Sequence, residues 1–300
     1  MRVAIIGRTE ILYETVQLLR NQGHEICLIV TAKEAPEYTR TADDFRKLAQ
    51  VLPTKFVQTA KIEEVIATIK SIPKMDIGVS LNYSGVIPQS VIDLFSIGIL
   101  NAHGGDLPRY RGNACQAWAI LNGEEKIGLC IHKMIGGELD SGNIIAREYL
   151  AIDHRTKVGE VWEWMSDRIP HLFLDSIRKL ETNKEFVLEK QSLDTALALR
   201  CYPRRPEDGL IDWRKPALEI LRLINASGRP YAGAYCEYEG EKLIVWDADL
   251  VEDNVVFLAV PGQVTHVGDA CGGRIRGHRL WGRKVATFPG RVQGGSDTCQ

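Results

Sequence analysis

The amino-terminal segment, residues 1–30, reads MRVAIIGRTEILYETVQLLRNQGHEICLIV. Residues 3–7 form a short apolar run, residues 11–20 carry apolar side chains at helical spacing, and residues 25–30 are apolar again. This pattern predicts strand, helix and strand, the opening of a parallel α/β sheet. The first loop holds one glycine, Gly7, whereas a dinucleotide fingerprint needs three at Gly-x-Gly-x-x-Gly spacing. We therefore predict a sheet of this type that does not bind NAD.

The same pattern continues to about residue 183 and then changes. Residues 200–210 are rich in proline and arginine, as in a linker. After a short predicted helix at 216–225, the sequence alternates and is rich in turns, which indicates a small β-barrel of about 90 residues. We predict a Rossmann-like α/β domain at 1–200 and a small, OB-like β-barrel domain at 201–300. Further predicted elements are strands at 56–57, 76–81, 97–101, 127–134, 144–149, 234–238, 242–246, 255–260 and 263–267, and helices at 62–69, 89–95 and 158–183.

The composition is that of an ordinary cytoplasmic protein. Of its 300 residues, 45% are hydrophobic and 25% charged, so two domains can each bury a core. A formal net charge of −2 gives no global field that would attract nucleic acid or an anionic membrane. The opening apolar run is too short for a signal peptide, and no run approaches the roughly 18 apolar residues of a membrane span. The seven cysteines are scattered without a Cys-x-x-Cys pair, which favours reduced thiols and no metal site.

One segment places several polar side chains at the end of a predicted strand. Residues 101–112 read NAHGGDLPRYRG. Open α/β sheets build ligand sites at the carboxyl ends of their strands, and side chains two apart on a strand, such as Asn101 and His103, point to the same face. An amide and an imidazole in one crevice suit acyl transfer, which needs a donor for a developing oxyanion and a group that manages a proton. The alternative is a buried histidine beside an asparagine that caps a turn.

A second segment adds a carboxylate. Residues 133–142 read KMIGGELDSG and form a glycine-rich loop between two predicted strands. Asp140 lies near the end of this loop, where an aspartate commonly completes a turn or caps a helix. If the loop bends back toward His103, the carboxylate would instead orient the imidazole and support its positive charge.

Together these motifs resemble those of the folate-dependent formyltransferases. The run Asn101-x-His103-Gly104 is followed by Leu107-Pro108-x-Tyr110-Arg111-Gly112 and, after the glycine loop, by Asp140-Ser141-Gly142. The resemblance covers nearly the whole chain, including Asp212-Trp213 and Ile244-Val245-Trp246. The family contains the methionyl-tRNA, glycinamide ribonucleotide and nucleotide-amino-sugar formyltransferases. Three motifs in this order are far more specific than any one of them.

The resemblance implies a role for each matching residue. Asn101 would hold the formyl oxygen as it gains negative charge, and His103 would stabilise that charge and assist proton transfer. Asp140 would orient His103 and help to remove the amine proton. The implied formyl donor is 10-formyltetrahydrofolate, with no metal required, and its pterin would lie between the loops at 81–87 and 135–140. The donor-binding residues so implied are Leu81, Asn82, Tyr83, Ile87, Ile135, Gly136 and Gly137.

The chain departs from the family pattern at two places. Gly105-Asp106-Leu107-Pro108 stands where the family usually has Ser-Leu-Leu-Pro, and Cys115 stands where proline is common. We expect Asp106 to place a negative charge near the acceptor side of the site. Cys115 is expected to be a buried structural thiol, because formyl transfer requires no covalent intermediate.

The charge of residues 31–50 bears on the amine acceptor. Family members that act on tRNA usually carry a basic insertion here, because folded RNA is held through phosphate contacts. In this chain the segment has four basic and four acidic side chains, which argues against tRNA. Residues 202–213 resemble the sugar-modifying branch instead, although we expect Arg204 and Arg205 to form a solvated clamp between the domains. We predict a dTDP- or UDP-linked amino sugar as the acceptor, bound by Arg8, Arg109, Tyr110 and Arg111.

Other functions stay open at this point. A formyltetrahydrofolate hydrolase would use water in place of the amine, and nothing in the sequence excludes it. A non-catalytic folate-binding module is disfavoured, because folding does not require Asn101, His103 and Asp140 together. The small domain is expected to assist acceptor binding or homodimer formation. A basic stretch in that domain could instead grip RNA, as in a methionyl-tRNA formyltransferase, or form a barrel rim; it consists of Arg274, Arg276, Arg279, Arg283 and Lys284.

Overall fold

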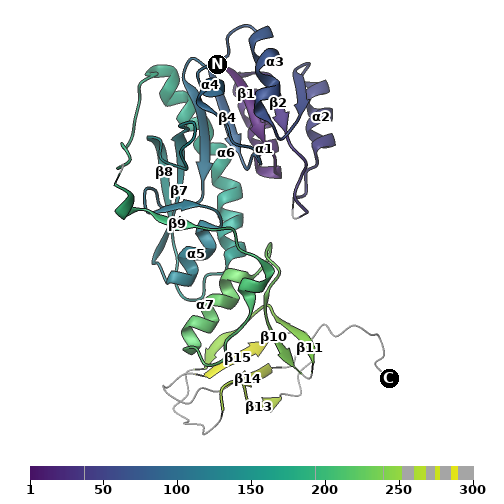
Figure 1. The fold of residues 1–300 in the computed structure, drawn as a ribbon, viewed down its shortest axis with the longest axis vertical. Helices are drawn as coiled ribbons and strands as arrows, with labels where there is room; N and C mark the ends of the chain where they lie inside the picture. Colours follow the sequence, from purple (N-terminus) through teal and green to yellow (C-terminus); the bar gives the residue numbers. More distant parts are fainter. Residues whose placement is uncertain are drawn as a thin grey trace. The chain divides into compact units, whose positions relative to one another are not determined.

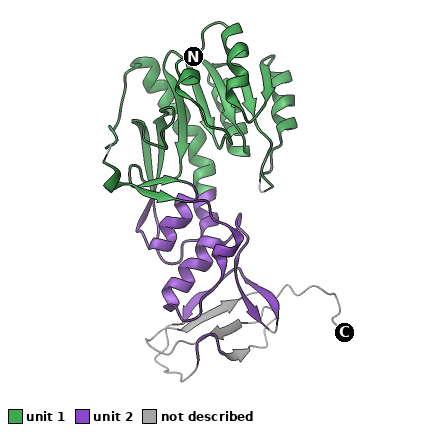
Figure 2. Cartoon of the chain, viewed as in Figure 1, with its two compact units in different colours: residues 1–112, 128–149, 163–201 green, residues 113–127, 150–162, 202–300 purple. Residues whose placement is uncertain are grey.

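The computed structural model of the chain divides into two compact units (Figure 2). The first contains residues 1–112, 128–149 and 163–201, and the second contains residues 113–127, 150–162 and the described part of 202–300. The division after residue 201 lies one residue from the predicted boundary, but two earlier segments group with the second unit. A functional division at residue 200 stays a prediction. The structure describes residues 1–36, 38–192, 194–238, 240–251, 260–267, 274–277 and 285–289.

The first unit is built around a seven-stranded sheet with the strand order β3-β2-β1-β4-β5-β7-β8 (Figure 1). Five of its strands run parallel to one another, which confirms the predicted α/β architecture. Except in β3, which has no buried residue, their central residues are almost all buried, as expected for strands covered on both faces. These strands are β1 (Arg2–Gly7), β2 (Glu25–Thr31), β3 (Lys55–Gln58), β4 (Ile77–Leu81) and β5 (Gly98–His103).

The sheet is mostly parallel, but β7 (Lys126–Lys133) runs antiparallel to β5. After β5 the chain continues through β6 (Tyr110–Gly112) and α5 (Cys115–Asn122) before β7 begins. No crossover returns the chain to the end of the sheet where β5 begins. β7 therefore starts near the end of β5 and runs in the opposite direction. The last strand in the order is β8 (Ile144–Ala151).

Short helical segments connect the parallel strands. The Thr9 hydroxyl accepts a hydrogen bond from the backbone N–H of Leu12 at 3.3 Å and so caps the first helix. Thr41 and Asp44 form a capping box at the start of the second. Apolar side chains of the later segments pack in one buried cluster with strand residues such as Ile6. The segments are α1 (Glu10–Asn21), α2 (Ala42–Val51), η1 (Ile62–Val65), α3 (Ile66–Ser71) and α4 (Gln89–Ile92).

Beyond the sheet, α6 (Val158–Thr182) matches the predicted long helix to within one residue and contains Pro170. The chain then passes through η2 (Thr195–Leu197) to β9 (Leu199–Cys201), which pairs parallel with β6. This small second sheet matters for the site, because β6 forms the end of the segment at residues 101–112 that was singled out in the sequence.

The second unit carries the predicted carboxyl-terminal β region. Its helix α7 packs against β10 and β11 around Ile220, Leu221 and Ile224, which are all buried. A four-stranded sheet has the order β12-β15-β14-β13. The elements are η3 (Pro206–Gly209), α7 (Ala217–Ser227), β10 (Ala234–Tyr238), β11 (Glu241–Val245), β12 (Asp249–Val251), β13 (Val264–Val267), β14 (Arg274–Gly277) and β15 (Val285–Pro289).

Arg204 belongs to this second unit rather than to a solvated clamp between domains. Its guanidinium is partly buried and donates to the Asp208 carbonyl at 2.8 Å, the Ala226 carbonyl at 3.3 Å and the Ser227 hydroxyl at 3.1 Å. Burial lowers the pKa of Arg204, with Tyr231 and Asp208 opposing that effect. The proline- and arginine-rich linker predicted a solvated arginine. The backbone carbonyls of Asp208 and Ala226 need hydrogen-bond donors, however, and Arg204 supplies them.

Two predictions for the carboxyl-terminal region cannot be followed through. Of the predicted strand at 255–260, residues 255–259 lie outside the described residues. Within the basic stretch, Arg274 and Arg276 lie on β14, whereas Arg279, Arg283 and Lys284 lie outside the described residues. In the part of the chain that the structure describes, no helix has the length and apolar content needed to cross a membrane.

Candidate active site

Asn101 and His103 lie at the carboxyl end of β5, as predicted, and alternate with the buried Ala102. β5 is an interior strand, so the site has a neighbour on each side. Asn101 is in register with Ser80 of β4 and with His132 of the antiparallel β7. His103 is buried with 7% of its surface exposed, and Asn101 is half-buried.

Asp140 reaches the imidazole from the glycine-rich loop, which is the second of the two alternatives that the sequence left open. Its Oδ2 atom lies 3.5 Å from Nδ1 of His103, and its side chain is 11% exposed. The same Oδ2 accepts a hydrogen bond from the backbone N–H of Gly112 at 2.9 Å. Asp140 adopts φ 49°, in the left-handed region that aspartate tolerates better than most residues. The loop therefore bends back and presents the carboxylate to β5.

The second ring nitrogen of His103 fixes the position of its proton. Nε2 lies 2.7 Å from the backbone carbonyl oxygen of Tyr110. A carbonyl oxygen only accepts hydrogen bonds, so Nε2 must carry a hydrogen atom. In neutral His103 the lone pair is therefore on Nδ1, the nitrogen that faces Asp140.

A second histidine, which sequence reasoning missed, faces the same carboxylate. His132 is 2% exposed, and its Nε2 lies 3.5 Å from Oδ1 of Asp140 and 3.3 Å from Nδ2 of Asn101. Its Nδ1 lies 3.0 Å from the Lys133 carbonyl oxygen, so Nδ1 carries the hydrogen and Nε2 of the neutral ring accepts from Asn101. The signal was available only through the register of β7, which places His132 opposite Asn101.

The electrostatics keep the carboxylate charged and the imidazole neutral. Burial opposes ionisation of Asp140, but the imidazoles of His103 and His132, which stabilise the carboxylate when they are protonated, and the Gly112 N–H hold its pKa well below the usual range. For His103, burial lowers the pKa and outweighs the opposite influence of Asp140. The site thus holds a charged acceptor beside a neutral base near pH 7.

Gln191 was also missed, and it connects two of the predicted site segments. Its amide donates to the backbone carbonyls of Asp140 at 2.9 Å and Gly142 at 2.6 Å. Its Oε1 accepts from the Arg111 guanidinium at 3.1 Å, and Arg111 also donates to the Ser192 carbonyl at 3.2 Å. Arg111, which we predicted to bind substrate, therefore ties the Asp140 loop in place. Nothing in the local sequence marks Gln191, because its role depends on a fold contact.

The other predicted substrate residues are placed as follows. Arg8 donates through Nε to the Asn82 carbonyl at 2.9 Å and through Nη1 to the Lys33 carbonyl at 2.6 Å. Arg109 is exposed, and its guanidinium lies 5.2 Å from the ring centre of Tyr110. The Tyr110 side chain is buried, and Tyr110 contributes to the site through its backbone carbonyl.

The two loops predicted to hold the donor are each tied to a neighbouring segment. The Gly136 N–H donates to Oε1 of Gln89, at the start of α4, at 2.8 Å. A Cβ atom at position 136 would lie 2.1 Å from the Gln89 nitrogen, so only glycine allows this approach. Tyr83 donates to the Thr59 carbonyl at 2.9 Å, and burial raises its pKa to about 12. Of the remaining predicted residues, Leu81 and Ile87 are buried, Asn82 is exposed at φ 50°, Ile135 is 39% exposed and Gly137 adopts φ 80°.

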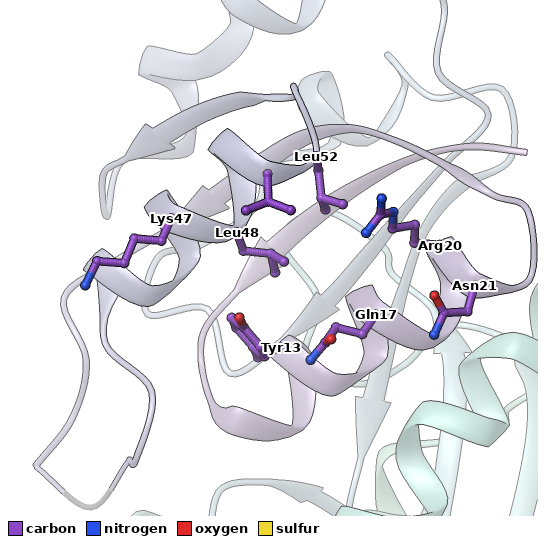
Figure 3. A pocket seen from close by; sticks show the side chains of 8 residues that line it. Tyr13, Gln17, Arg20, Asn21, Lys47, Leu48 and Leu52 are labelled. Atoms are coloured by element: carbon purple, nitrogen blue, oxygen red, sulfur yellow. The ribbon is translucent and has the colours of Figure 1, made fainter.

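A separate pocket lies between α1 and α2 (Figure 3). Tyr13, Gln17 and Lys47 are among its lining residues. It contains none of the residues assembled around Asp140. Among the described residues, no group of three or more histidine, cysteine, aspartate or glutamate side chains could hold a metal ion.

The amino-acid sequence has close counterparts among known proteins. It matches the formyl transferase family over residues 1–177 and the formyl transferase C-terminal domain over residues 204–277. The methionyl-tRNA formyltransferase of Alkaliphilus oremlandii is 29% identical over 281 residues, which span 90% of this chain and 86% of that protein. The methionyl-tRNA formyltransferase of Agathobacter rectalis is 28% identical over 273 residues, which span 89% and 86%.

Solved structures share the fold at lower identity. An N-formyltransferase from Helicobacter canadensis, crystallised with folinic acid and dTDP-3-aminofucose, has a TM-score of 0.71 at 15% identity and covers 95% of this chain and 98% of its own. A sugar 3N-formyl transferase, crystallised with dTDP and 5-N-formyl-THF, has a TM-score of 0.68 at 17% identity over 96% and 97%. Because the first family match spans more than half of the residues, the chain belongs to the formyl transferase family of enzymes.

Proposed function

We propose that this chain is a cytoplasmic enzyme that transfers a formyl group from 10-formyltetrahydrofolate to the amine of a nucleotide-linked amino sugar. Formyl transfer follows from family membership, whereas the donor and the acceptor are our inference. The observation that carries the chemistry is the grouping of Asn101, His103 and Asp140 at one edge of the sheet, with Nδ1 of His103 3.5 Å from the carboxylate. A cytoplasmic location suits the cysteines, since all five described ones are free thiols.

The tautomer of His103 defines a route for the amine proton. Because Nε2 donates to the Tyr110 carbonyl, the lone pair on Nδ1 can accept a proton from the attacking amine. The imidazolium that results is stabilised by Asp140, which stays ionised. Asn101 shares one Nδ2 hydrogen with His132, and the other can donate to the formyl oxygen as it gains charge.

The surface beside this edge fits a flat aromatic donor. The loop at 135–140 is joined through the Gly136 N–H to Gln89, which follows the loop at 81–87 in the chain. The two loops expose large apolar side chains, namely Val86 at 75%, Ile135 at 39% and Leu139 at 38%. Exposed apolar side chains on neighbouring loops mark a binding surface more often than a single exposed residue does. 10-Formyltetrahydrofolate bound there would supply the formyl group, and the predicted donor-binding residues belong to this proposal.

Arg8 and Arg109 are the proposed contacts for the diphosphate of the acceptor. Gly7 is in register with Leu81, and Ser80 is in register with Asn101, so Arg8 leaves the sheet two strands from the site. Neighbouring strands lie about 4.8 Å apart, which places the two positions about 10 Å apart along the edge. That span suits a sugar amine at one end and a diphosphate at the other. Tyr110 and Arg111 act through the positions they give His103 and Asp140.

Methionyl-tRNA is the alternative acceptor, because the curated relatives are named for it. Three of the four basic side chains in residues 31–50 contact aromatic or acidic side chains of the chain itself, which leaves little positive charge in this segment to bind RNA phosphates. Arg40 lies 4.4 Å from the ring centre of Tyr13, and both Arg46 and Lys47 pair with Asp43. A strongly salt-dependent affinity for tRNA would nevertheless favour this alternative.

The proposal is tested by tetrahydrofolate release from 10-formyltetrahydrofolate with dTDP- and UDP-linked amino sugars, methionyl-tRNA and no acceptor in parallel. We expect release that depends on one nucleotide sugar. Release only with methionyl-tRNA would move the function to that acceptor, and release without any acceptor would indicate a hydrolase. Homodimer formation stays a prediction, which sedimentation equilibrium checks.

A further inference from the structure

A second carboxylate near the site has a different set of partners. Asp106, in the segment between β5 and β6, accepts from Nη1 of Arg147 at 2.5 Å and from the Tyr149 hydroxyl at 3.1 Å. Arg147 lies on β8, and its side chain is 9% exposed. Its Nη2 donates to the Leu107 carbonyl at 2.7 Å and pairs with Glu189 at 3.0 Å. The negative charge of Asp106, which we expected on the acceptor side of the site, is thus neutralised by Arg147 within the first unit.

The guanidinium is linked to His103 by a short path of hydrogen bonds. Arg147 holds both the side chain of Asp106 and the carbonyl of Leu107. The Asp106 carbonyl then accepts from the backbone N–H groups of Arg109 at 2.9 Å and Tyr110 at 3.1 Å. The Tyr110 carbonyl in turn accepts from Nε2 of His103. One turn therefore separates the ion pair from the ring nitrogen whose hydrogen fixes the tautomer.

The turn at residues 106–110 also packs tightly against strand β7 of the sheet. A Cβ atom at Gly128 of β7 would lie 2.7 Å from the Cα atom of Asp106, so the turn rests directly on that strand. Cys130 donates to the Gly105 carbonyl at 3.5 Å, and burial raises the pKa of this thiol to about 11, so it stays a donor. The contact at Gly128 limits movement toward the sheet. Movement away from it is limited by Arg147, together with the Tyr149 hydroxyl and the Leu199 N–H that donates to the Arg109 carbonyl.

We infer that Arg147 is a positioning residue, which holds the turn at residues 106–110 through Asp106 and Leu107 and thereby sets the tautomer and orientation of His103. This inference rests on the proposed role of His103. A guanidinium suits the task because its planar fork can bind a carboxylate and a carbonyl at once in a fixed geometry, whereas an ammonium is a point charge without that geometry. Arg147 itself does not touch the reacting groups.

Neighbouring residues of the same strand provide a matched control. Glu148 of β8 forms a two-pronged pair with Arg168 of α6, with both N···O distances 2.8 Å. Successive residues of a strand face opposite sides, so this pair lies on the other face of β8 from Arg147. Arg168→Gln removes one arginine from an ion pair just as Arg147→Gln does, but it has no path to His103.

The test combines a spectrum and a rate in the full-length chain. A long-range ¹H–¹⁵N spectrum of labelled protein is expected to show His103 with its hydrogen on Nε2, and Arg147→Gln is expected to give a mixed tautomer pattern. Formyl transfer should fall about 10- to 100-fold in kcat with donor KM changed less than about threefold, since a displacement near 1 Å can cost a factor of 10². Arg147→Lys should recover only part of the rate. Arg168→Gln should change neither readout.

Several outcomes would overturn the inference. An unchanged His103 tautomer pattern in folded Arg147→Gln protein would do so whatever the activity, because the spectrum needs no acceptor. Equal rate losses in Arg147→Gln and Arg168→Gln would reduce Arg147 to general stability. If Arg147 acts through His103, Arg147→Gln adds no further loss to a His103→Ala background, whereas independent losses would contradict that path. Should Arg147→Gln fail to fold, Asp106→Asn keeps the side-chain volume and is expected to shift the tautomer pattern in the same direction.

Discussion

Asp106 lies in the segment that links β5 to β6 and Asp140 in the loop that links β7 to β8, and the two carboxylates have different kinds of partner. Asp140 faces two imidazoles and a backbone N–H. Asp106 faces a guanidinium and a phenol. An imidazole can gain or lose a proton near pH 7, whereas a guanidinium keeps its charge throughout. The partner therefore decides whether a buried carboxylate takes part in proton transfer or only fixes a turn.

Substitution of Asp140 gives the most direct test of this difference between the two carboxylates. Asp140→Asn keeps the shape and removes the charge that stabilises the imidazolium, so we expect kcat to fall by about 10² to 10⁴. His103→Ala should fall within the same range, and the double variant should lose little more, because the two act as a unit. Steady-state kinetics with saturating donor measure both. Asp175→Asn on α6, a carboxylate 55% exposed, is the control and should keep full activity.

His132 tests whether one imidazole beside Asp140 is enough. His132→Gln removes the ring that faces Oδ1 and accepts from Asn101. We expect a loss of about 10- to 100-fold in kcat, at or below the lower end of the range for a direct acid or base. An effect as large as that of His103→Ala would show that the two histidines share the chemistry, and the assignment of His103 as the base would then need revision.

The pH profile separates the two carboxylates by the size of the shift that each substitution causes. Burial lowers the pKa of His103 below its usual value of 6.5, and the neutral ring is the active form. Activity should therefore be kept at neutral pH and be lost as the pH falls through this lowered pKa. In Asp140→Asn the remaining acid limb should move to still lower pH, because a negative charge that favours the imidazolium is gone. In Asp106→Asn the limb should move less, since Arg147 already neutralises that carboxylate. An acid limb that moves to higher pH in Asp140→Asn would contradict the assigned pair.

The smallest effect is expected at the control ion pair. Arg168 is 36% exposed in its pair with Glu148, so water screens the attraction. Arg168→Gln should lower the free energy of unfolding by less than about 1 kcal/mol. Urea denaturation of the folded chain measures this change. A loss of several kcal/mol would mean that β8 and α6 depend on this pair far more than its exposure implies.

Sequence reasoning singled out three residues that the structure brings together, and their catalytic roles stay a prediction. Asn101 and His103 follow from strand alternation, and Asp140 follows from a glycine loop near the next strands. His132 and Gln191 were missed because their roles depend on tertiary register. An antiparallel β7 brings His132 opposite Asn101, and Gln191, which lies 51 residues beyond Asp140, reaches that loop only through the fold.

The same limit applies to charges. Asp106 was visible as a departure from the family pattern, but its partner Arg147 is 41 residues further along the chain. Composition and spacing report how many charges a segment carries, whereas pairing depends on which strands become neighbours. In residues 31–50 the equal numbers of acidic and basic side chains did indicate local ion pairs, because helix spacing brings charges such as those of Asp43 and Lys47 together.

Arg8 has a consequence for how a ligand meets this edge of the sheet. Its backbone N–H donates to Leu81, and its side chain donates to the carbonyls of Asn82 and Lys33. One residue thus joins the segments that follow β1, β2 and β4. Fixing a backbone residue costs about 1 to 2 kcal/mol in conformational entropy. Here the segments are already fixed when the chain folds, so ligand binding does not have to order them. Encounter with a ligand at this edge should accordingly be limited by diffusion and orientation, with no slow ordering phase in the binding kinetics.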